Sequence, residues 1–315
     1  MTPPPSVLVS DAIAEAGVAR MRAAGLAVDV RTGLKPEAIA AVIAGYDAWI
    51  VRSATKATRD LIEQGTRLKV IARAGVGLDN VDAEAARARG IEVLNTPGAT
   101  AISVAEHAIG LMFALSRHFA AADRTMRAGQ WEKKRFEGRE LSGKTLGLVG
   151  LGRIGQEVSR RAIALGMRVL ANRSRVTRPS DDLSALGIRV VPLEELLPAS
   201  DIVSLHCPLT EQTRNIINAT TLQQMRKGAL LIHCARGGVV DEEALGEALR
   251  SGHLGGAALD VFPEEPVKGT HPLAAFQNVI LTPHLGASTA EGQTRAGEEV
   301  AGLVIAALLP GSKNV

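Results

Sequence analysis

Three polar residues in the second half of the chain could carry acid–base and anion chemistry. Arg236 in HCARGG, Glu265 in DVFPEEP and His284 in TPHLGAS each follow a short apolar run typical of a buried strand. Ligands of open α/β sheets bind at the carboxyl ends of the strands, so we expect these side chains at one site. A histidine can accept a hydroxyl proton, and a neighbouring carboxylate can fix the tautomer of that histidine. An arginine can bind the carboxylate of a substrate. Taken singly, each residue could also be an ordinary capping cation, turn acid or loop histidine.

A glycine pattern upstream predicts a nucleotide site. GLGRIG (150–155) follows an apolar strand pattern and opens a helical one. Gly150 permits a tight turn, Gly152 lets the backbone approach a pyrophosphate, and Gly155 allows close packing of helix on strand. The helix N-terminus would then offer its N–H groups to the phosphates. The alternative is an ordinary glycine-rich turn without a ligand.

The strand end after this helix lacks the acid that usually binds ribose hydroxyls. Arg173, in LANRSR, stands eighteen residues after Gly155, where a carboxylate is normal in an NAD site. A guanidinium there would instead pair with a 2′-phosphate, and Asn172, Ser174 and Arg175 add donors. The sequence therefore predicts NADP as the cofactor. NAD stays possible if the arginines are solvated surface charges.

The elements that would position these residues alternate along the chain. Short β-branched runs at 6–10, 48–53 and 68–75 are separated by helical patterns, and a second such series begins after Gly143. This alternation is typical of parallel sheets covered by helices. We predict an α/β protein with two doubly wound parallel-sheet domains. One continuous helix is expected from 103 to 130, apolar at its start and basic at its end.

Composition excludes several classes of protein. The 315 residues suggest about two domains, and 46% hydrophobic residues predict packed cores. A net charge of +3 with 3% aromatic residues argues against nucleic acid as a partner. The sequence shows neither a signal-peptide pattern nor an apolar run long enough to span a bilayer, so we expect a cytoplasmic protein and no membrane partner. Two cysteines, Cys207 and Cys234, match no zinc pattern, and no metal is predicted.

Four motifs together resemble the D-2-hydroxyacid dehydrogenase family: LVGLGRIGQEV, HCARGGVVDEEAL, GAALDVFPEEP and LTPHLGAST, in this order. The first half, with WIVRSATKAT and VIARAGVGLDNVD, is more specifically similar to the phosphoglycerate dehydrogenases of that family. The resemblance implies that Arg236 binds the substrate carboxylate, that His284 donates and accepts the proton, and that Glu265 orients His284. It further implies that Asp260 binds the nicotinamide amide.

The resemblance and the residue patterns together give two sets of predicted binding residues. The cofactor set is Gly150, Gly152, Arg153, Ile154, Gly155, Asn172, Arg173, Ser174, Arg175, His206, Cys207, Pro208, Thr213, Cys234, Ala235, Asp260 and Gly286. The substrate set is Arg52, Ser53, Arg73, Val76 and Gly77. A phosphorylated substrate would need further cations, for which Lys56 and 133–135 are candidates. The last three are equally well explained as a solvated face.

The family's fold implies a Rossmann-type cofactor domain (99–288) inserted in a flavodoxin-like substrate domain (1–98 and 289–315). The resemblance also implies that the helix after residue 100 forms the dimer contact. The whole assembly is expected to be a homodimer or a homotetramer. The chain ends at Val315, before the regulatory region of longer phosphoglycerate dehydrogenases, so serine feedback through such a region is not expected.

The substrate expected is 3-phosphoglycerate or 3-phosphohydroxypyruvate. An NADPH-dependent glyoxylate or hydroxypyruvate reductase is the alternative enzyme, since it would share every catalytic residue. A cofactor-sensing corepressor on the same fold is the alternative of another class, but it would not need Arg236, Glu265 and His284 together.

Overall fold

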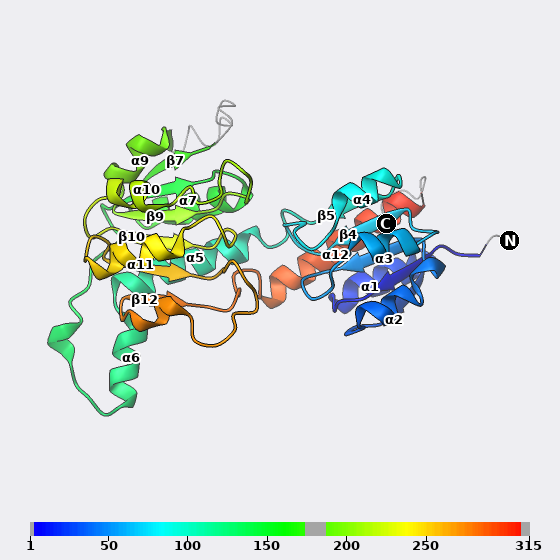
Figure 1. The fold of residues 1–315 in the computed structure, drawn as a ribbon, viewed down its shortest axis with the longest axis horizontal. Coiled ribbons are helices and arrows are strands. Elements are labelled where there is room, and N and C mark those ends of the chain that lie inside the picture. The colour runs from blue at the N-terminus through cyan, green and yellow to red at the C-terminus, as the bar shows by residue number, and fades with distance from the viewer. Residues whose placement is uncertain (1–2, 174–186, 310–315) are drawn as a thin grey trace. The chain divides into compact units, whose positions relative to one another are not determined.

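The computed structural model describes residues 3–173 and 187–309 of the chain. The chain folds into two compact units. Unit 1 consists of Met1–Ala101 and Ser288–Val315, and unit 2 of Ile102–Ala287. Unit 2 is thus inserted in unit 1, and the long C-terminal helix returns to the sheet formed by the first strands (Figure 1).

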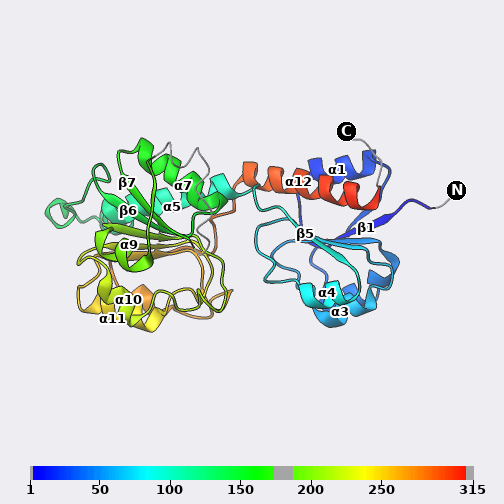
Figure 2. The same ribbon diagram turned by 90° about the horizontal axis from the view of Figure 1, so that it is seen from above.

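Unit 1 is built on one parallel sheet with the strand order β2-β1-β3-β4-β5. Its strands are β1 (Ser6–Val9), β2 (Ala27–Val30), β3 (Ala48–Val51), β4 (Val70–Arg73) and β5 (Glu92–Asn95). Helices α1 (Glu15–Ala23) and α12 (Ala290–Leu308) cover one face, as Figure 2 shows. The other face carries α2 (Pro36–Ala40), the turn η1 (Ile43–Gly45), α3 (Arg59–Gln64) and α4 (Ala83–Ala88). Apolar side chains pack on both faces of this sheet. Its inner strands are therefore buried on two sides and carry no polar face.

Unit 2 holds a second parallel sheet, ordered β12-β11-β10-β9-β6-β7-β8. The strands are β6 (Thr145–Val149), β7 (Arg168–Asn172), β8 (Arg189–Val190), β9 (Ile202–Leu205), β10 (Leu230–His233), β11 (Gly256–Leu259) and β12 (Val279–Leu281). One face is covered by α5 (Ala101–Ser116) and α7 (Arg153–Ala164), the other by α9 (Leu193–Ala199), α10 (Ala219–Gln224) and α11 (Glu242–Arg250). A short turn, η3 (Pro272–Ala275), connects β11 to β12. The order reverses between β6 and β9, which creates the crevice where such sheets bind ligands. The predicted fold class is confirmed.

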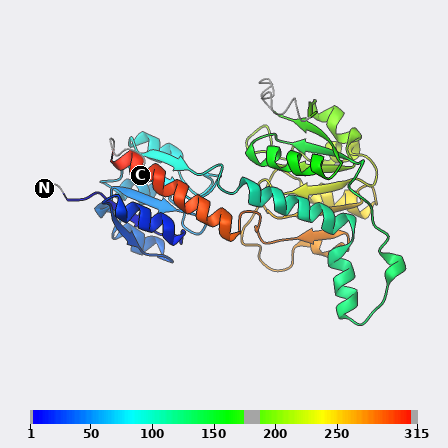
Figure 3. The ribbon, with the colours of Figure 1, turned by 180° about the vertical axis from the view of Figure 1, so that it is seen from behind.

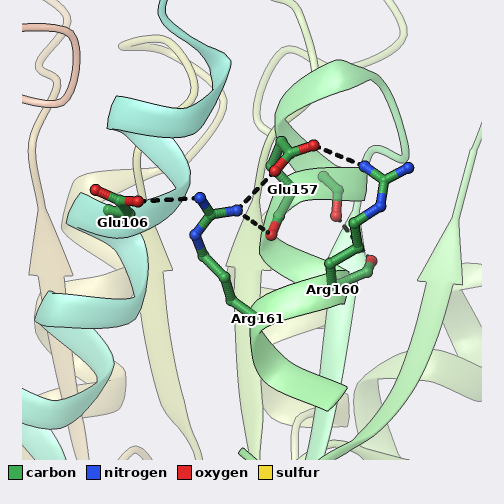
Figure 4. Close-up of polar contacts among 6 residues, drawn as sticks. Glu106, Glu157, Arg160 and Arg161 are labelled. Carbon is green, nitrogen blue, oxygen red and sulfur yellow. Dashed lines mark hydrogen bonds and ion pairs between the residues drawn. The ribbon is translucent and has the colours of Figure 1, made fainter. Parts of the chain in front are cut away.

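An ion-pair network joins the two helices that share a face of this sheet (Figure 4). The guanidinium of Arg161 on α7 lies 3.0 Å from Glu106 on α5 and 2.7 Å from Glu157 one turn earlier on its own helix. Arg160 pairs with the same Glu157 at 2.6 Å. Because the side chains are partly exposed, the network contributes little to the stability of the fold.

The prediction of a single helix from 103 to 130 is wrong, because the chain forms two helices there. After α5 ends at Ser116, His118 adopts a left-handed conformation with φ of 57°, and α6 runs only from Phe119 to Arg127. A left-handed residue cannot continue an α-helix, so the direction changes there. Figure 3 shows α6 leaving the sheet that α5 covers, followed by the turn η2 (Lys133–Arg135). No residue of α6 is buried.

Candidate active site

The strand register of unit 2 brings one end of five strands into a row. Val149, Leu205, His233, Leu259 and Leu281 are paired across neighbouring strands. The next residues along each strand therefore share one edge of the sheet. They are Gly150, His206, Cys234, Asp260 and Thr282. The edge is the carboxyl end of the sheet, where the ligands of such folds bind.

The glycine turn after β6 has the geometry of a phosphate cradle. Gly150 has φ of 105°, and a Cβ there would lie 2.7 Å from the backbone of His206. A Cβ at Gly155 would lie 2.3 Å from the carbonyl oxygen of Gly150, so helix and turn can touch only because Gly155 lacks a side chain. A Cβ at Gly152 would meet nothing within 4 Å.

The helix that follows is open to a ligand at its N-terminus. Gly152 is the N-cap of α7 and makes no side-chain capping hydrogen bond. The first N–H groups of α7, from Arg153, Ile154 and Gly155, therefore receive no side-chain oxygen from their N-cap residue. Backbone N–H groups and the helix dipole at such a position suit a phosphate. The residues present fit a dinucleotide.

Of the four residues predicted to bind a 2′-phosphate, the structure describes two, Asn172 and Arg173, at the end of β7. Asn172 ends the strand, and its side-chain amide donates to the carbonyl of Val191 at 3.1 Å. Arg173 follows directly and is half-buried. Ser174 and Arg175 lie outside the described residues. The structure therefore places one of the two arginines at the carboxyl end of the strand next to the glycine turn.

Glu265 and His284 meet, although nineteen residues separate them. The Oε2 atom of Glu265 lies 2.6 Å from Nδ1 of His284, and Oε1 accepts the Phe262 N–H at 2.9 Å. Partial burial pushes the pKa of Glu265 upward, but the hydrogen bonds from His284 and Phe262 outweigh it and hold that pKa below its usual value. The ionised carboxylate accepts from Nδ1–H, which leaves Nε2 of His284 as the atom that can exchange a proton. The imidazole is about half exposed.

Arg236 follows β10 in a half-buried loop, and its guanidinium donates to the carbonyl of Ala235 at 2.7 Å. The glycine after it is tightly enclosed. A Cβ at Gly237 would lie 2.0 Å from the carbonyl oxygen of Phe262, in the segment that leads to Glu265. Arg236 and Glu265 are therefore carried by two loops in direct backbone contact.

Asp260 is the most heavily bonded acid of the site. Its Oδ1 accepts the Thr282 hydroxyl at 2.6 Å and the Leu285 N–H at 2.8 Å, and its Oδ2 accepts the Gly286 N–H at 2.8 Å. The side chain is almost fully buried, which alone would raise its pKa. The hydrogen bonds outweigh burial and keep the pKa below the usual range. Asp260 is thus an ionised acid beneath the loop that carries His284.

Two histidines at this edge are held neutral. Burial, with a smaller contribution from His233, lowers the pKa of His206 to about 3. Burial lowers the pKa of His233 to about 4, although the nearby Arg236 backbone and the charges of Asp260 and Glu265 oppose it. The Nδ1 atoms of both rings are buried without a hydrogen-bond partner among the described residues.

The remaining predicted cofactor residues of unit 2 lie along the same edge. Cys207 and Cys234 are buried free thiols, and burial raises the pKa of Cys207 to about 11. Burial and the charge of Asp260 also raise the pKa of Cys234. Ala235 is buried, and Thr213 donates its hydroxyl hydrogen to the carbonyl of Pro208 at 2.6 Å. Both thiols stay protonated and unreactive at neutral pH.

The predicted substrate residues belong to unit 1. Arg52 follows β3 and is half-buried. Its guanidinium has no hydrogen bond or ion-pair contact among the described residues, and burial lowers its pKa despite Asp11. Arg73 donates instead to the carbonyls of Arg52 and Gly77, so it braces the loop after β4. Val76 in that loop accepts a hydrogen bond from Asn95, while Ser53 is exposed.

Sequence reasoning missed two members of the site in unit 2. His107 on α5 lies with its Nε2 3.3 Å from Oδ1 of Asp260 and 3.2 Å from the Thr282 hydroxyl. A histidine within the small, apolar pattern SVAEHAIGLMF was the available signal, but nothing in the sequence shows which strand it faces. Thr282 is the first residue of the TPH motif, but nothing in the sequence indicates that its hydroxyl meets Asp260.

Among the described residues, no three or more His, Cys, Asp and Glu side chains form a group that could hold a metal ion. No helix in residues 3–173 or 187–309 is both long and apolar enough to cross a membrane.

Comparison with known proteins identifies the family. Residues 109–286 match the model of the NAD-binding domain of D-isomer specific 2-hydroxyacid dehydrogenases. The chain is 49% identical to a hydroxypyruvate reductase of Thermotoga maritima, over 85% of this chain and 86% of that protein. It is 47% identical to a D-3-phosphoglycerate dehydrogenase of Methanocaldococcus jannaschii over 94% of this chain, but it spans only 56% of that protein's length.

A solved structure agrees with this assignment. The D-lactate dehydrogenase of Aquifex aeolicus, crystallised with NAD and lactic acid, superposes with a TM-score of 0.82 at 31% identity and covers 96% of this chain and 94% of its own. Its fold is that of the two sheets described above. The chain belongs to the D-isomer specific 2-hydroxyacid dehydrogenase family.

Proposed function

We propose that this protein transfers hydride between a nicotinamide cofactor and a D-2-hydroxyacid, and that its substrate pair is 3-phosphoglycerate and 3-phosphohydroxypyruvate. The observation that carries the proposal is the 2.6 Å contact between Glu265 and His284 at the sheet edge that also holds the glycine turn. An imidazole paired with an ionised carboxylate is the acid–base that alcohol oxidation and carbonyl reduction require.

The residues of unit 2 divide the chemistry between them. The cofactor, when bound, supplies or accepts the hydride. His284 would remove the hydroxyl proton at its Nε2 in oxidation and return it in reduction, while Glu265 stabilises the charged imidazolium. Arg236 would bind the substrate carboxylate, because a guanidinium matches its two oxygens. The three roles are those that the family resemblance assigns to these positions.

A phosphorylated substrate is supported by Arg52. A half-buried guanidinium without a hydrogen-bonded acid retains its capacity for an anion, and burial strengthens its attraction to one. Lys56 is exposed four residues further on and would add charge. By contrast, Arg135 already pairs with Glu132 at 2.8 Å. This pairing favours the view of residues 133–135 as a solvated face.

The second candidate is a glyoxylate or hydroxypyruvate reductase. The observation in its favour is the 49% identity to the Thermotoga maritima hydroxypyruvate reductase, over 86% of that protein. Both candidates would use Arg236, Glu265 and His284. They differ in whether Arg52 contributes to substrate affinity.

We propose NADP as the preferred cofactor, with NAD as the alternative. Arg173 supports NADP, since it stands at the end of β7 where a carboxylate would repel a 2′-phosphate. The NAD bound to the related Aquifex aeolicus enzyme is the reason to keep NAD open.

We also propose a homodimer in which α6 and the nearby Trp131 contact a second copy. Phe119, Met126 and Trp131 expose 54%, 54% and 79% of their surface, unusual for large apolar side chains. Trp131→Glu should convert the dimer to a monomer in size-exclusion chromatography with light scattering. Val267→Glu changes an exposed apolar residue elsewhere in unit 2 and should leave the mass unchanged.

The function is tested with a panel of substrates and both cofactors. Initial rates are followed at the absorbance of the reduced nicotinamide with 3-phosphohydroxypyruvate, hydroxypyruvate and glyoxylate. The highest kcat/KM with 3-phosphohydroxypyruvate supports the proposal, and a higher value with an unphosphorylated acid assigns the reductase. No turnover with any 2-oxoacid would contradict both.

A further inference from the structure

His107 takes part in a hydrogen-bonded cluster around the buried carboxylate of Asp260. The ring reaches it from α5, on one face of the sheet, whereas Asp260 and Thr282 follow β11 and β12. Nε2 lies 3.3 Å from Oδ1 of Asp260 and 3.2 Å from the Thr282 hydroxyl oxygen, so one ring atom faces both oxygens. All three residues belong to unit 2.

The proton positions in this cluster follow from counting donors. The Thr282 hydroxyl has one hydrogen, and its 2.6 Å contact gives that hydrogen to Oδ1 of Asp260. Asp260 is ionised and can only accept. The His107 Nε2 faces two acceptors and must therefore carry a hydrogen, which it shares between the carboxylate and the hydroxyl oxygen.

The donors on Asp260 are distributed unequally over its two oxygens. Oδ1 accepts from Thr282 and Leu285 and faces His107, whereas Oδ2 accepts only from Gly286 among the described residues. A carboxylate oxygen offers about two acceptor positions. Oδ1 is saturated, and Oδ2 keeps capacity for one further donor, such as the amide of the nicotinamide carboxamide.

The same carboxylate fixes the loop that carries His284. The Leu285 and Gly286 N–H groups that Asp260 accepts come directly after His284. His284 itself has φ of 53°, in the left-handed region that non-glycine residues rarely adopt. Hydrogen bonds on the next two residues hold that conformation in place. A change in the orientation of Asp260 would move the reacting imidazole.

We propose that His107 is a positioning residue of the reaction: by donating to Oδ1 of Asp260, it holds the carboxylate with Oδ2 directed to the nicotinamide amide and keeps the His284 loop in its active conformation. The proposal rests on the function given above, because it places Asp260 beside the nicotinamide. His107 contacts neither substrate nor cofactor in this role and acts only through Asp260.

Other titratable groups near Asp260 do not substitute for His107. His233 and Cys234, at the end of β10, are both neutral at pH 7 because burial lowers the pKa of the first and raises that of the second. Glu265 is negative and opposes ionisation of Asp260, while His284 is engaged with Glu265. Loss of the His107 donor should therefore raise the pKa of Asp260.

The test compares His107→Phe, which removes the donor, with His107→Gln, whose side-chain amide can still donate. Affinity is measured without substrate, by calorimetry, for the reduced cofactor and for the matching ADP-ribose fragment that lacks nicotinamide. His107→Phe should weaken the whole cofactor about tenfold, the low end for a hydrogen bond to a charged group because this one is long and shared. The fragment should bind unchanged, and His107→Gln should restore most of the loss.

A pH profile supplies the second readout. Asp260 must be ionised, so the acid limb of kcat/KM should move to higher pH in His107→Phe and return in His107→Gln. His253→Phe is the matched control, since it removes another part-buried histidine, bonded to the Leu222 carbonyl at 3.0 Å away from the sheet edge. It can lower thermal stability but should shift neither the acid limb nor the affinity ratio.

Equal losses for cofactor and fragment, no loss for either, or an unmoved acid limb with His107→Gln as impaired as His107→Phe would overturn the proposal. The binding measurement does not depend on the acid that the enzyme reduces. If no 2-oxoacid is turned over but the nicotinamide-specific loss is observed, the proposed function fails, and the role of His107 in nicotinamide binding stands.

Discussion

Glu265 connects the loop after β11 with the loop after β12: its Oε1 accepts the Phe262 N–H at 2.9 Å, and its Oε2 contacts Nδ1 of His284 at 2.6 Å. The bond from Phe262 prevents the carboxylate from turning away when His284 changes its protonation state. The contact with His284 also stabilises the imidazolium more than the neutral ring. Glu265 therefore sets both the orientation of His284 and the ease with which it gains a proton.

Glu265→Gln should separate these two effects. The amide oxygen can still accept from Phe262, but the amide N–H₂ would face Nδ1 of His284 and donate to it. His284 would then carry its hydrogen on Nε2 as a neutral ring, a poor base in oxidation and a weak acid in reduction. We expect turnover to fall by about two to four orders of magnitude. The apparent pKa of the reduction profile should also fall, since the imidazolium loses its anion.

The control for this prediction lies next to it in the sequence. Glu264 is exposed and pairs with Lys268 at 2.6 Å, so Glu264→Gln should leave rate and pH profile unchanged. An unshifted profile in Glu265→Gln would show that the pair seen in the structure does not control the proton.

His284→Asn tests the acid–base itself. Asparagine tolerates the left-handed backbone better than most residues, so the loop should keep its conformation at φ near 53°. Turnover should fall by about two to four orders of magnitude, the usual contribution of a positioned acid–base. Cofactor affinity, measured by the fluorescence of the reduced nicotinamide, should change little. Near-normal turnover would remove His284 from the mechanism.

Arg52→Ala distinguishes the two candidate substrates. The side chain is half-buried, while the backbone N–H of Arg52 still holds Asp11 at 2.6 Å in the variant. We expect KM for 3-phosphohydroxypyruvate to rise by about one to two orders of magnitude, the effect of losing one charge-assisted contact. KM for hydroxypyruvate should stay nearly constant. Arg59→Ala removes an exposed arginine that pairs with Asp82 and should affect neither. Equal effects of Arg52→Ala on both acids would favour the reductase.

The parts of the site that follow from strand order could be predicted from the sequence. Glu265 and His284 come after neighbouring parallel strands, and parallel strands deliver their carboxyl ends to one edge. The glycine turn could also be predicted, because a Cβ at Gly150 or at Gly155 would collide with nearby backbone atoms. In both cases the local pattern and the packing impose the same answer.

The parts that depend on side-chain partners across the fold could not be predicted. His107 meets Asp260 only because α5 lies across the sheet, and helical periodicity gives its face but not its neighbour. The sequence predicts Arg73 as a substrate-binding residue, but it does not show that the Arg73 guanidinium donates to the carbonyls of Arg52 and Gly77. The break at His118 has no glycine or proline to mark it. The sequence indicates which residues could take part in binding or catalysis, whereas the packing of the fold determines which of them already have hydrogen-bond partners.

We predict that Arg173 determines which cofactor the enzyme prefers. If it binds the 2′-phosphate, NADPH should exceed NADH in kcat/KM by about ten- to several-hundred-fold, since a charge-assisted hydrogen bond contributes about 1.5–3 kcal/mol. The preference should shrink as salt rises, because the arginine is partly exposed. Arg173→Asp should reverse it further than Arg173→Ala, since a carboxylate repels the phosphate and accepts from the ribose hydroxyls.

The control for Arg173 lies on the same strand. Arg168 begins β7 and is exposed at the opposite end, so Arg168→Asp makes the same charge change away from the ribose. It should leave the NADPH/NADH ratio unaltered at each salt concentration, which excludes a general effect of net charge. If the parent enzyme prefers NADH, or if Arg173→Asp behaves like Arg168→Asp, then Arg173 is a surface charge beside an NAD site, and the preference must come from other residues.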